Sequence, residues 1–202
     1  MFGPIIIGEK CVLASFGSGE IERIWKLLQD PEVIKYLKME MPPSLEAEKS
    51  WYQNVIDSKD AIYWGIWIPD RSHTLGNEPT SLASSVIVNE VPMELVGTCS
   101  LEEISYHHQR GKTGTLLFDK TAWGKGIATE MMRLRLDWAF TALPLRKICS
   151  GYLADNTASA KMQERAGYQI AGIQREHFWR NGIWQDHVTT EIMRENWSST
   201  RA

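Results

Sequence analysis

The sequence predicts a single mixed α/β domain, and two observations support this fold class. The chain has 202 residues and 43% hydrophobic residues, which suits one domain with one sizeable core. In its second half, strand-like runs at 113–118 and 146–153 alternate with helix-like runs at 129–140 and 156–166. Such an alternation is typical of helices that cross between strands of one sheet. No repeat, low-complexity tract or linker divides residues 1–202.

Charge and composition exclude several classes of function. The formal net charge is -3, so nothing in the composition indicates a nucleic-acid partner. No apolar run approaches the ~18 residues that span a bilayer, and the N-terminus lacks the basic start of a signal peptide. The three cysteines are odd in number and widely spaced, which fits neither a disulfide framework nor a metal site. We therefore expect a reduced, cytoplasmic protein without membrane contact or bound metal.

The first third of the chain predicts a strand or hairpin followed by three helices. Residues 5–16 form the first strand-like run, and residues 19–29 place apolar side chains at helical spacing. Asp30-Pro31 has the residue types preferred at the cap and first position of a short helix. Ser44, followed by acidic residues, caps another helix that is expected to run to about Ser58.

The middle of the chain predicts strands on both sides of a polar loop. Residues 61–68 are rich in Ile, Tyr and Trp, which strands favour. Residues 69–81 are polar and contain Gly, Asn and Pro, which indicates a mobile surface loop. Further strands are expected at 84–88, 94–106 and 113–118, with a turn at 107–112 before the last.

The remaining elements are two helices, a strand between them and a closing hairpin. The helix at 129–140 has an apolar stripe on one side and charged side chains on the other. Asp155 and Asn156 are suitable caps for a helix that ends at Ala166, because Gly167 suits the position after a helix. Strands are expected at 146–153, 168–179 and 183–193, the last two joined by a turn at Asn181-Gly182.

A glycine-rich turn joins the strand at 113–118 to the helix that follows. Two glycines in three residues allow backbone to approach a ligand without interference from a Cβ atom. The first N–H groups of the helix have no partner within it and, with the helix dipole, form an anion site. The loop therefore predicts a phosphate site to which Lys125 adds a cation. The residues expected to line it are Trp123, Gly124, Lys125, Gly126, Ile127, Ala128 and Thr129.

Other interpretations of this loop can be compared with the phosphate site. A tight turn between a strand and a helix needs no ligand at all. The dinucleotide pattern G-x-G-x-x-G fails because its last position is Thr129. A P-loop that ends at Gly111-Lys112-Thr113 fails because its first glycine would fall on Tyr106.

The loop resembles the pyrophosphate loop of the GNAT acetyltransferase superfamily, whose pattern is [Gln/Arg]-x-x-Gly-x-[Gly/Ala]. Trp123 takes the first position, and this version is typical of the branch that resembles the RimJ/RimL ribosomal-protein alanine and serine acetyltransferases. The resemblance covers most of the chain and is best from Val96 to Trp197. Three further features occur in the family's order, namely Asn156 with Ser159, Gly167-Tyr168, and the Asn181-Gly182 turn followed by Asp186.

The resemblance implies a mostly antiparallel mixed sheet of about seven strands, flanked by helices and splayed at its centre to hold acyl-CoA. It implies an acetyl-CoA-dependent N-acetyltransferase in which an amine attacks the thioester directly. The oxyanion then needs a fixed donor, for which we expect the N–H of Leu117 or Phe118. In the same way, Ser159 is expected to donate to the leaving thiolate and Asn156 to contact the pantetheine arm. Taken alone, these two residues would be a first-turn serine and an N-cap.

The catalytic base does not carry over from the family, although a base or a water chain must take the amine's proton. Serine-type enzymes of this branch have a glutamate three residues before the Asn-Gly turn, where this chain has Phe178. Alanine-type enzymes have a glutamate five residues before the Asn of the helix start, where this chain has Gly151. The remaining candidates are Glu176, His177, Glu102 and Glu103.

Two arguments narrow these candidates. His177 has an unperturbed pKa in the useful range. Neighbouring residues of a regular strand face opposite sides, so His177 and Phe178 cannot both face the site there. Asp186 is expected to hold the hairpin rather than to act in catalysis.

The acceptor is the least defined feature. No carboxylate cluster of the size that a strongly polycationic acceptor needs is evident in the sequence. A protein or peptide N-terminal α-amine is the first interpretation, ahead of a small amine such as an antibiotic, polyamine or amino acid. A non-catalytic acyl-CoA sensor is favoured by the missing bases and disfavoured by Ser159 and Asn156. Both a monomer and a homodimer are open. Trp25, Trp51, Trp64, Trp67, Trp179 and Trp184 are candidates for an acceptor groove, although core packing explains most of them.

Overall fold

The secondary structure follows the predicted alternation of strands and helices. The computed structural model describes the chain except for residues 38, 40, 71–85, 89, 181 and 200–202. The strands are β1 (Ile6–Ile7), β2 (Val12–Ala14), β3 (Ile62–Pro69), β4 (Ile87–Val88), β5 (Val91–Ser105), β6 (Arg110–Leu117), β7 (Lys147–Leu153), β8 (Gln169–Arg180) and β9 (Ile183–Met193). The α-helices are α1 (Ile21–Leu27), α2 (Pro31–Ile34), α3 (Leu45–Asp57), α5 (Ile127–Ala142), α6 (Thr157–Arg165) and α7 (Arg194–Ser199), and 3-10 helices are η1 (Ser18–Glu20) and η2 (Lys120–Ala122).

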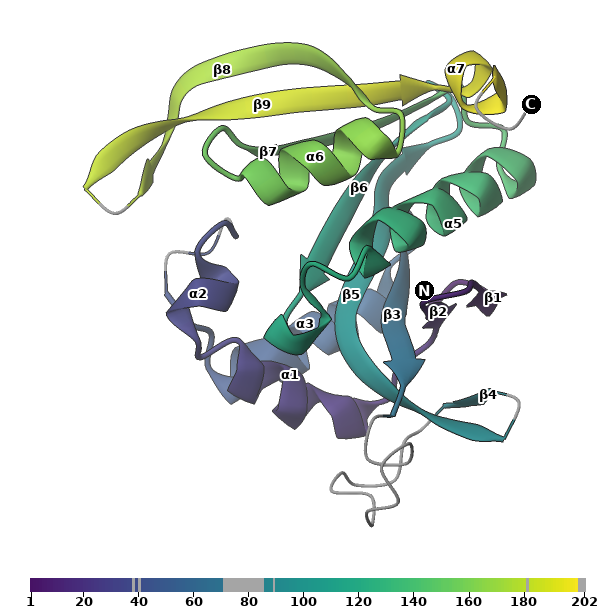
Figure 1. Ribbon diagram of the computed structural model, residues 1–202, viewed down its shortest axis with the longest axis vertical. Coiled ribbons are helices and arrows are strands. Elements are labelled where there is room, and N and C mark those ends of the chain that lie inside the picture. The colour runs from purple at the N-terminus through teal and green to yellow at the C-terminus, as the bar shows by residue number, and fades with distance from the viewer. Residues whose placement is uncertain (38, 40, 71–85, 89, 181, 200–202) are drawn as a thin grey trace.

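One open sheet runs through the molecule (Figure 1). Its strands are ordered β1-β2-β3-β5-β6-β7-β9-β8, and β4 pairs with β5 outside this path. Neighbours are antiparallel except for β6 and β7. The mixed, mostly antiparallel sheet is therefore confirmed, and the short strands β1 and β4 account for the excess over about seven strands.

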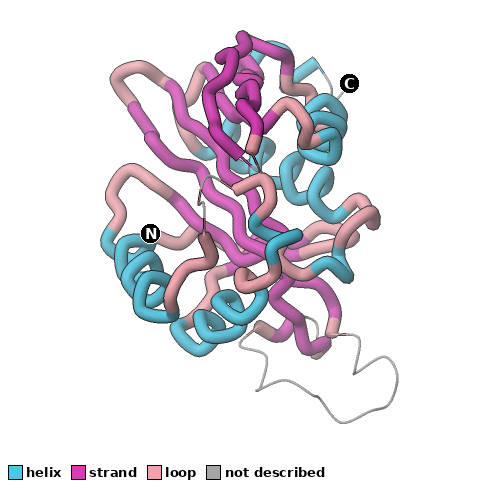
Figure 2. Tube along the Cα trace, turned by 90° about the vertical axis from the view of Figure 1, so that its left-hand side faces the viewer, coloured by secondary structure: helices cyan, strands magenta, loops and turns pink. Residues whose placement is uncertain are grey.

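Helices cover both faces of the sheet (Figure 2). On one face, α5 buries Met131, Leu136 and Phe140 against residues such as Trp64 of β3 and Ile148 of β7. On the other face, α1 and α2 pack on β2, β3 and β5 around a second group of buried apolar side chains. No helix in the described part of the chain is long and apolar enough to cross a bilayer.

Local sequence signals place the starts of α2, α3 and α6 where they were predicted. The side chains of Asp30, Ser44 and Asn156 each accept a backbone N–H from the first turn of α2, α3 and α6. Gly167 has φ +92 and ends α6. The helix expected at 129–140 begins two residues earlier, at Ile127, and ends at Ala142. Most of the loop expected at 69–81, part of the strand expected at 84–88, and Asn181 of the hairpin turn lie outside the described residues.

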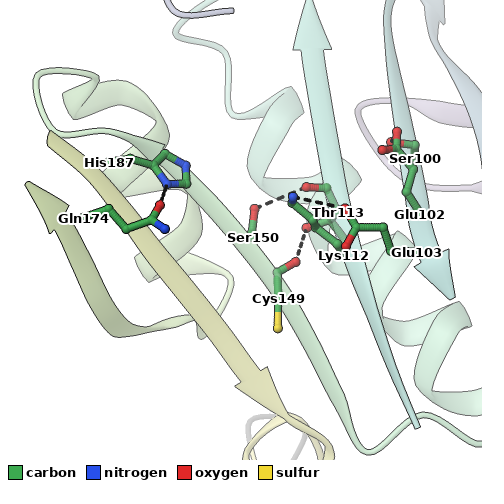
Figure 3. Close-up of polar contacts among 9 residues, drawn as sticks. All are labelled: Ser100, Glu102, Glu103, Lys112, Thr113, Cys149, Ser150, Gln174 and His187. Carbon is green, nitrogen blue, oxygen red and sulfur yellow. Dashed lines mark hydrogen bonds and ion pairs between the residues drawn. The ribbon is translucent and has the colours of Figure 1, made fainter. Parts of the chain in front are cut away.

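Strands β6 and β7 pair only at their first residues. The parallel register joins Arg110–Lys112 to Lys147–Cys149 and then ends. Immediately after it, the Thr113 hydroxyl donates to the Cys149 carbonyl at 3.3 Å, and the Ser150 hydroxyl donates to the Thr113 carbonyl at 3.5 Å (Figure 3). Beyond the paired residues, side-chain hydroxyls donate to these carbonyls, and the backbone pairing does not continue. The sheet is therefore splayed at its centre, as expected.

Helix α7 holds the C-terminal end of α5 and was not among the predicted elements. Arg194 donates to the carbonyls of Phe140, Leu143 and Leu145 at 2.5, 2.6 and 2.7 Å. These carbonyls follow or end α5, where backbone acceptors lack helical partners. The sequence did not predict this role because the acceptors lie 49–54 residues earlier in the chain.

The Arg194 contacts generate a stability prediction. Arg194→Met should lower the free energy of unfolding by about 2–4 kcal/mol, because three partly buried carbonyls lose a charged donor. The matched control is Arg146→Met, since Arg146 is an exposed arginine in the same region. Urea denaturation followed by circular dichroism measures both variants. Equal stability of the two variants would contradict the prediction.

Candidate functional site

The glycine loop has the geometry of an anion site. Gly124 and Gly126 have φ values of +73 and +79, in the left-handed region that favours glycine. Among the described residues, no acceptor takes the N–H groups of residues 124–129, and the first helical bond runs from Glu130 N–H to Gly126 O at 3.1 Å. These amides lie at the positive end of the α5 dipole. Trp123, outside this set, donates its indole N–H to the Leu117 carbonyl at 3.0 Å and so ties the loop to β6.

A second lysine lies over the same loop. The Nζ atom of Lys10 is 3.5 Å from the Lys125 carbonyl and 2.9 Å from the position that a Cβ would take on Gly126. The Glu130 carboxylate accepts the N–H groups of Glu9 and Lys10 at 2.8 and 2.7 Å, so the β1–β2 turn is held on the first turn of α5. Sequence reasoning missed Lys10, which lies 115 residues before Lys125 and belongs to no motif.

The two expected oxyanion donors are not equivalent. The Phe118 N–H donates to the Val96 carbonyl at 3.1 Å, and the Phe118 side chain is fully buried. Neighbouring residues of an antiparallel ladder direct their N–H groups to opposite edges. The Leu117 N–H therefore points away from β5, toward the gap between β6 and β7. Phe118 is unsuited to the role, and the expectation narrows to Leu117.

Helix α6 begins across this gap and presents Ser159. Asn156 is the N-cap and accepts the Ser159 N–H at 3.0 Å. The Nε2 amide group of Gln163 donates to the Ser159 hydroxyl at 3.2 Å and to the Gly151 carbonyl at 3.3 Å. The Gln163 oxygen accepts from Thr190, which fixes the orientation of the amide. Because the Ser159 oxygen already accepts a hydrogen bond, its own proton is directed to another acceptor.

Gln163 is a second residue that sequence reasoning missed. It is buried and lies one helical turn after Ser159, so the spacing was visible in the sequence. Its partner Thr190 is on β9, and that contact becomes visible only once the sheet is assembled.

Strand β8 is irregular beside the gap. The register with β9 shifts between Gln174 and Phe178, and Glu176 adopts φ +48. The Asp186 carboxylate accepts the Glu176 N–H at 2.8 Å, so Asp186 holds the hairpin as expected. His177 and Phe178 line the same hollow. The expectation that only one of them could face the site held for a regular strand, and it does not apply to this bulged one.

The candidate bases occupy different surroundings. Glu176 is exposed and does not line that hollow, whereas His177 does. Glu103 forms an ion pair with Lys112 at 3.2 Å, and Glu102 accepts the Ser100 hydroxyl at 2.6 Å (Figure 3). Within the described residues, Ser159 forms hydrogen bonds with Asn156 and Gln163 and with none of these four candidate bases.

Two hollows on the sheet face opposite α6 meet at Phe178 and His187. The smaller, of about 80 Å³, is lined by Tyr36, Leu37, Gly151, Tyr152, Leu153, Phe178, Arg180 and His187. The larger, of about 470 Å³, extends from these residues over β7 and β6 to Glu103. Arg180 donates to the Leu37 and Met39 carbonyls and so joins β8 to the segment after α2.

His187 lies against the backbone of Gly151. A Cβ on Gly151 would come within 2.7 Å of Nε2 and 2.8 Å of Cε1 of the His187 ring. The Nδ1 atom of His187 is 3.0 Å from the Gln174 side-chain oxygen (Figure 3). His187 was not among the predicted bases. Its position beside Gly151 depends on the pairing of β7 with β9, which the sequence does not display.

The tryptophans and the nearby cysteine have simpler roles. Trp64 and Trp67 are buried in the core, Trp25 and Trp51 are half-buried, and Trp179 and Trp184 are exposed near the hairpin turn. Burial raises the pKa of the Cys149 thiol, which lines the larger hollow. Cys149 is therefore protonated at neutral pH and poorly suited to be a nucleophile. Within the described residues, no group of His, Cys, Asp and Glu is arranged to hold a metal ion.

The chain matches a known family over most of its length. The model of the acetyltransferase (GNAT) domain matches residues 11–169. YjcK, a probable N-acetyltransferase of Bacillus subtilis, is 39% identical over 103 residues, which are 49% of this chain and 55% of YjcK. That alignment therefore spans little more than half the length of the relative.

Two solved structures share the fold. One is spermidine N-acetyltransferase from Vibrio cholerae in complex with CoA and spermine, with a TM-score of 0.76 and 21% identity, covering 95% of this chain and 99% of that one. The other is RimL, a ribosomal L7/L12 alpha-N-protein acetyltransferase in complex with coenzyme A, with a TM-score of 0.73 and 16% identity, covering 94% and 98%. Because both align over almost the whole chain, the likeness does not single out the RimJ/RimL branch.

The glycine loop generates a binding prediction. Gly126→Val should abolish the rise in melting temperature that millimolar coenzyme A produces, because the side chain fills the space at the amide groups and Val disfavours φ +79. Gly182→Val is the matched control, since Gly182 has the same φ of +79 in the β8–β9 turn. The control should melt earlier but keep the ligand-induced shift. A shift that survives in Gly126→Val would remove the loop from the binding site.

Proposed function

The chain belongs to the GNAT acetyltransferase family, and we propose that it acetylates a primary amine of a small molecule that carries a second positive charge. As a member of this family it is an N-acetyltransferase that uses acetyl-CoA. When bound, acetyl-CoA supplies a thioester that an amine can attack. The amides of residues 124–129, with Lys125 and Lys10, are placed to bind the pyrophosphate. The proposal thus uses the predicted loop of residues 124–129 and adds Lys10, which the sequence did not indicate.

A group of carboxylates supports the choice of acceptor. A hollow of about 450 Å³ lies beside β3 and β5, and Glu103 lines both this hollow and the one that reaches His187. Four carboxylates line the hollow beside β3 and β5, namely those of Asp57, Asp60, Glu102 and Glu103. A diamine or polyamine could place its reacting nitrogen near Gly151 and a distal ammonium toward these groups. The sequence did not reveal the group because the pairing of β3 with β5 assembles it.

A protein or peptide N-terminal α-amine is the second candidate acceptor. It is supported by the exposed rings of Trp179 and Trp184, whose centroids are 5.3 Å apart and offer apolar contact area to a peptide. The likeness to RimL and the Trp123 version of the loop point the same way. We retain the RimJ/RimL-like assignment only as this second candidate.

The position of Ser159 supports turnover rather than a sensor without catalysis. Its hydroxyl accepts from Gln163, so its proton is available to a departing thiolate. The Leu117 N–H is directed into the same gap and can stabilise the oxyanion. A module that only binds acyl-CoA needs neither group. The three unpaired cysteines support a cytoplasmic location.

An acceptor screen tests the proposed substrate class. Free thiol released from acetyl-CoA should be fastest with spermidine, spermine or putrescine, slower with matched monoamines, and slowest with peptides that begin with Ala or Ser. Asp57→Asn with Asp60→Asn should raise the KM for spermidine roughly three- to tenfold while the KM for a monoamine stays unchanged, because only the distal charge loses its partners. Faster turnover of peptides than of polyamines would select the second candidate.

Ser159 generates a mechanistic prediction. Ser159→Ala should reduce kcat by about ten- to a thousandfold with acetyl-CoA affinity nearly unchanged, because the donor acts on charge that grows only in the transition state. Thr157→Ala is the control, since Thr157 is an exposed hydroxyl in the same helix turn. Steady-state kinetics and thermal melts are measured on both. Unchanged kcat with a lower melting temperature would make Ser159 a structural residue.

A further inference from the structure

We propose that His187 is the catalytic base that removes a proton from the acceptor amine. The proposal rests on the proposed function only in requiring that an amine is acetylated. It does not depend on which amine is the substrate.

The first argument is the place that the imidazole occupies. Gly151 stands where the alanine-type enzymes of the family carry a glutamate, so this chain has no carboxylate at that position. The Nε2 atom of His187 lies 2.7 Å from where the Cβ of such a residue would begin. A histidine from β9 thus fills the space that the missing side chain would use. The absence of a Cβ on Gly151 is what admits the ring.

The second argument is the orientation of the ring. The Gln174 side-chain oxygen is 3.0 Å from Nδ1 of His187. With the amide oxygen facing the ring, as assigned in the structure, the Nδ1–H donates and the lone pair is placed on Nε2. Gln174 therefore sets the tautomer that a base needs, with the basic nitrogen on the side of Gly151. This is the orienting contact expected around a working base.

The third argument is that His187 and Ser159 lie on opposite sides of Gly151. The Gly151 carbonyl accepts from Gln163, which also donates to the Ser159 hydroxyl. Val188 and Thr190 are buried toward α6, so the alternation of β9 places His187 on the opposite face of the sheet. A thioester held in the gap beside Gly151 would thus have Ser159 on one side and His187 on the other. In that arrangement a proton acceptor for the amine and a proton donor for the sulfur would not compete for the same position.

The proton balance of the reaction defines what His187 must do. The acceptor reaches the site as an ammonium, and Nε2 of His187 takes one proton so that the nitrogen lone pair can attack the carbonyl carbon. The C–N bond forms, the C–S bond breaks, and the electron pair of that bond leaves on sulfur. The nitrogen then loses its second proton while the sulfur gains one. One proton per turnover is therefore released to water from His187.

Among the described residues, His177 is a competing imidazole close to His187, and it is the matched control. Its ring centroid is 5.8 Å from that of His187, and it lines the larger hollow. It does not line the smaller hollow that contains Gly151, which His187 does. It is also exposed, whereas His187 is half-buried. A base acting at Gly151 is therefore His187 rather than His177.

The test compares four variants in one assay of thiol release with the best acceptor of the parent enzyme. His187→Gln should reduce kcat about a hundred- to ten-thousandfold, the scale of a lost acid–base residue. His177→Gln should change kcat by less than about tenfold. His187→Gly should regain activity when imidazole is added, whereas His177→Gly should not respond. Coenzyme A should raise the melting temperature of every variant as it does for the parent, which verifies folding and donor binding.

A relocation variant gives an independent test. Gly151→Glu alone should be inactive or unstable, because its side chain meets the His187 ring. Gly151→Glu combined with His187→Ala should recover at least about tenfold over His187→Ala, since a carboxylate then takes the same place. Parent activity that survives in His187→Gln, or His187→Gly that folds, binds coenzyme A and ignores imidazole, would overturn the proposal. Failure of the parent to acetylate any amine would instead overturn the proposed function.

Discussion

The early separation of β6 from β7 is the constraint on which the rest of the structure depends. Backbone pairing ends at Lys112 and Cys149, where the hydroxyls of Thr113 and Ser150 take up carbonyl groups at the edge of the ladder. The Tyr168 hydroxyl, 3.1 Å from that of Thr113, completes this buried polar junction. A regular parallel pair would satisfy its own backbone and leave no gap. Because the strands part, N–H groups of β6 and side chains around β7 face an opening rather than each other.

Side chains reach the opening between β6 and β7 from opposite faces of β7. Helix α6 supplies Ser159 and Gln163 from one face, and β9 supplies His187 from the other. Gly151 is the residue that both sides contact, through its carbonyl and through its lack of a Cβ. One glycine therefore allows Ser159, the proposed thiolate donor, and His187, the proposed base, to approach the same short stretch of backbone. From the sequence, Gly151 shows only that this chain lacks the glutamate that alanine-type enzymes have at this position.

Charge is distributed to match the two substrates expected of this family. At the start of α5, the amides of residues 124–129 and the ammonium groups of Lys10 and Lys125 form the site that we propose for the anionic donor. On the far side of the sheet, carboxylates gather around Glu103, which belongs to both of the larger hollows there. The net charge of -3 conceals this division, because opposite charges are placed in separate regions of one domain.

The sequence by itself determined those helix starts and turns that depend only on residues close by in the chain. Side-chain caps at Asp30, Ser44 and Asn156 act within a few residues, so the starts of α2, α3 and α6 were predictable. The left-handed backbone of the glycines before α5 has an equally local cause. Tertiary structure decided which side chains meet in the gap. His187 reaches Gly151 through strand pairing, Lys10 reaches the loop through Glu130, and the bulge at Glu176 turns both His177 and Phe178 into one hollow. These contacts join segments far apart in the chain, and no local pattern encodes them because the free energy that forms them comes from burial and pairing of the assembled sheet.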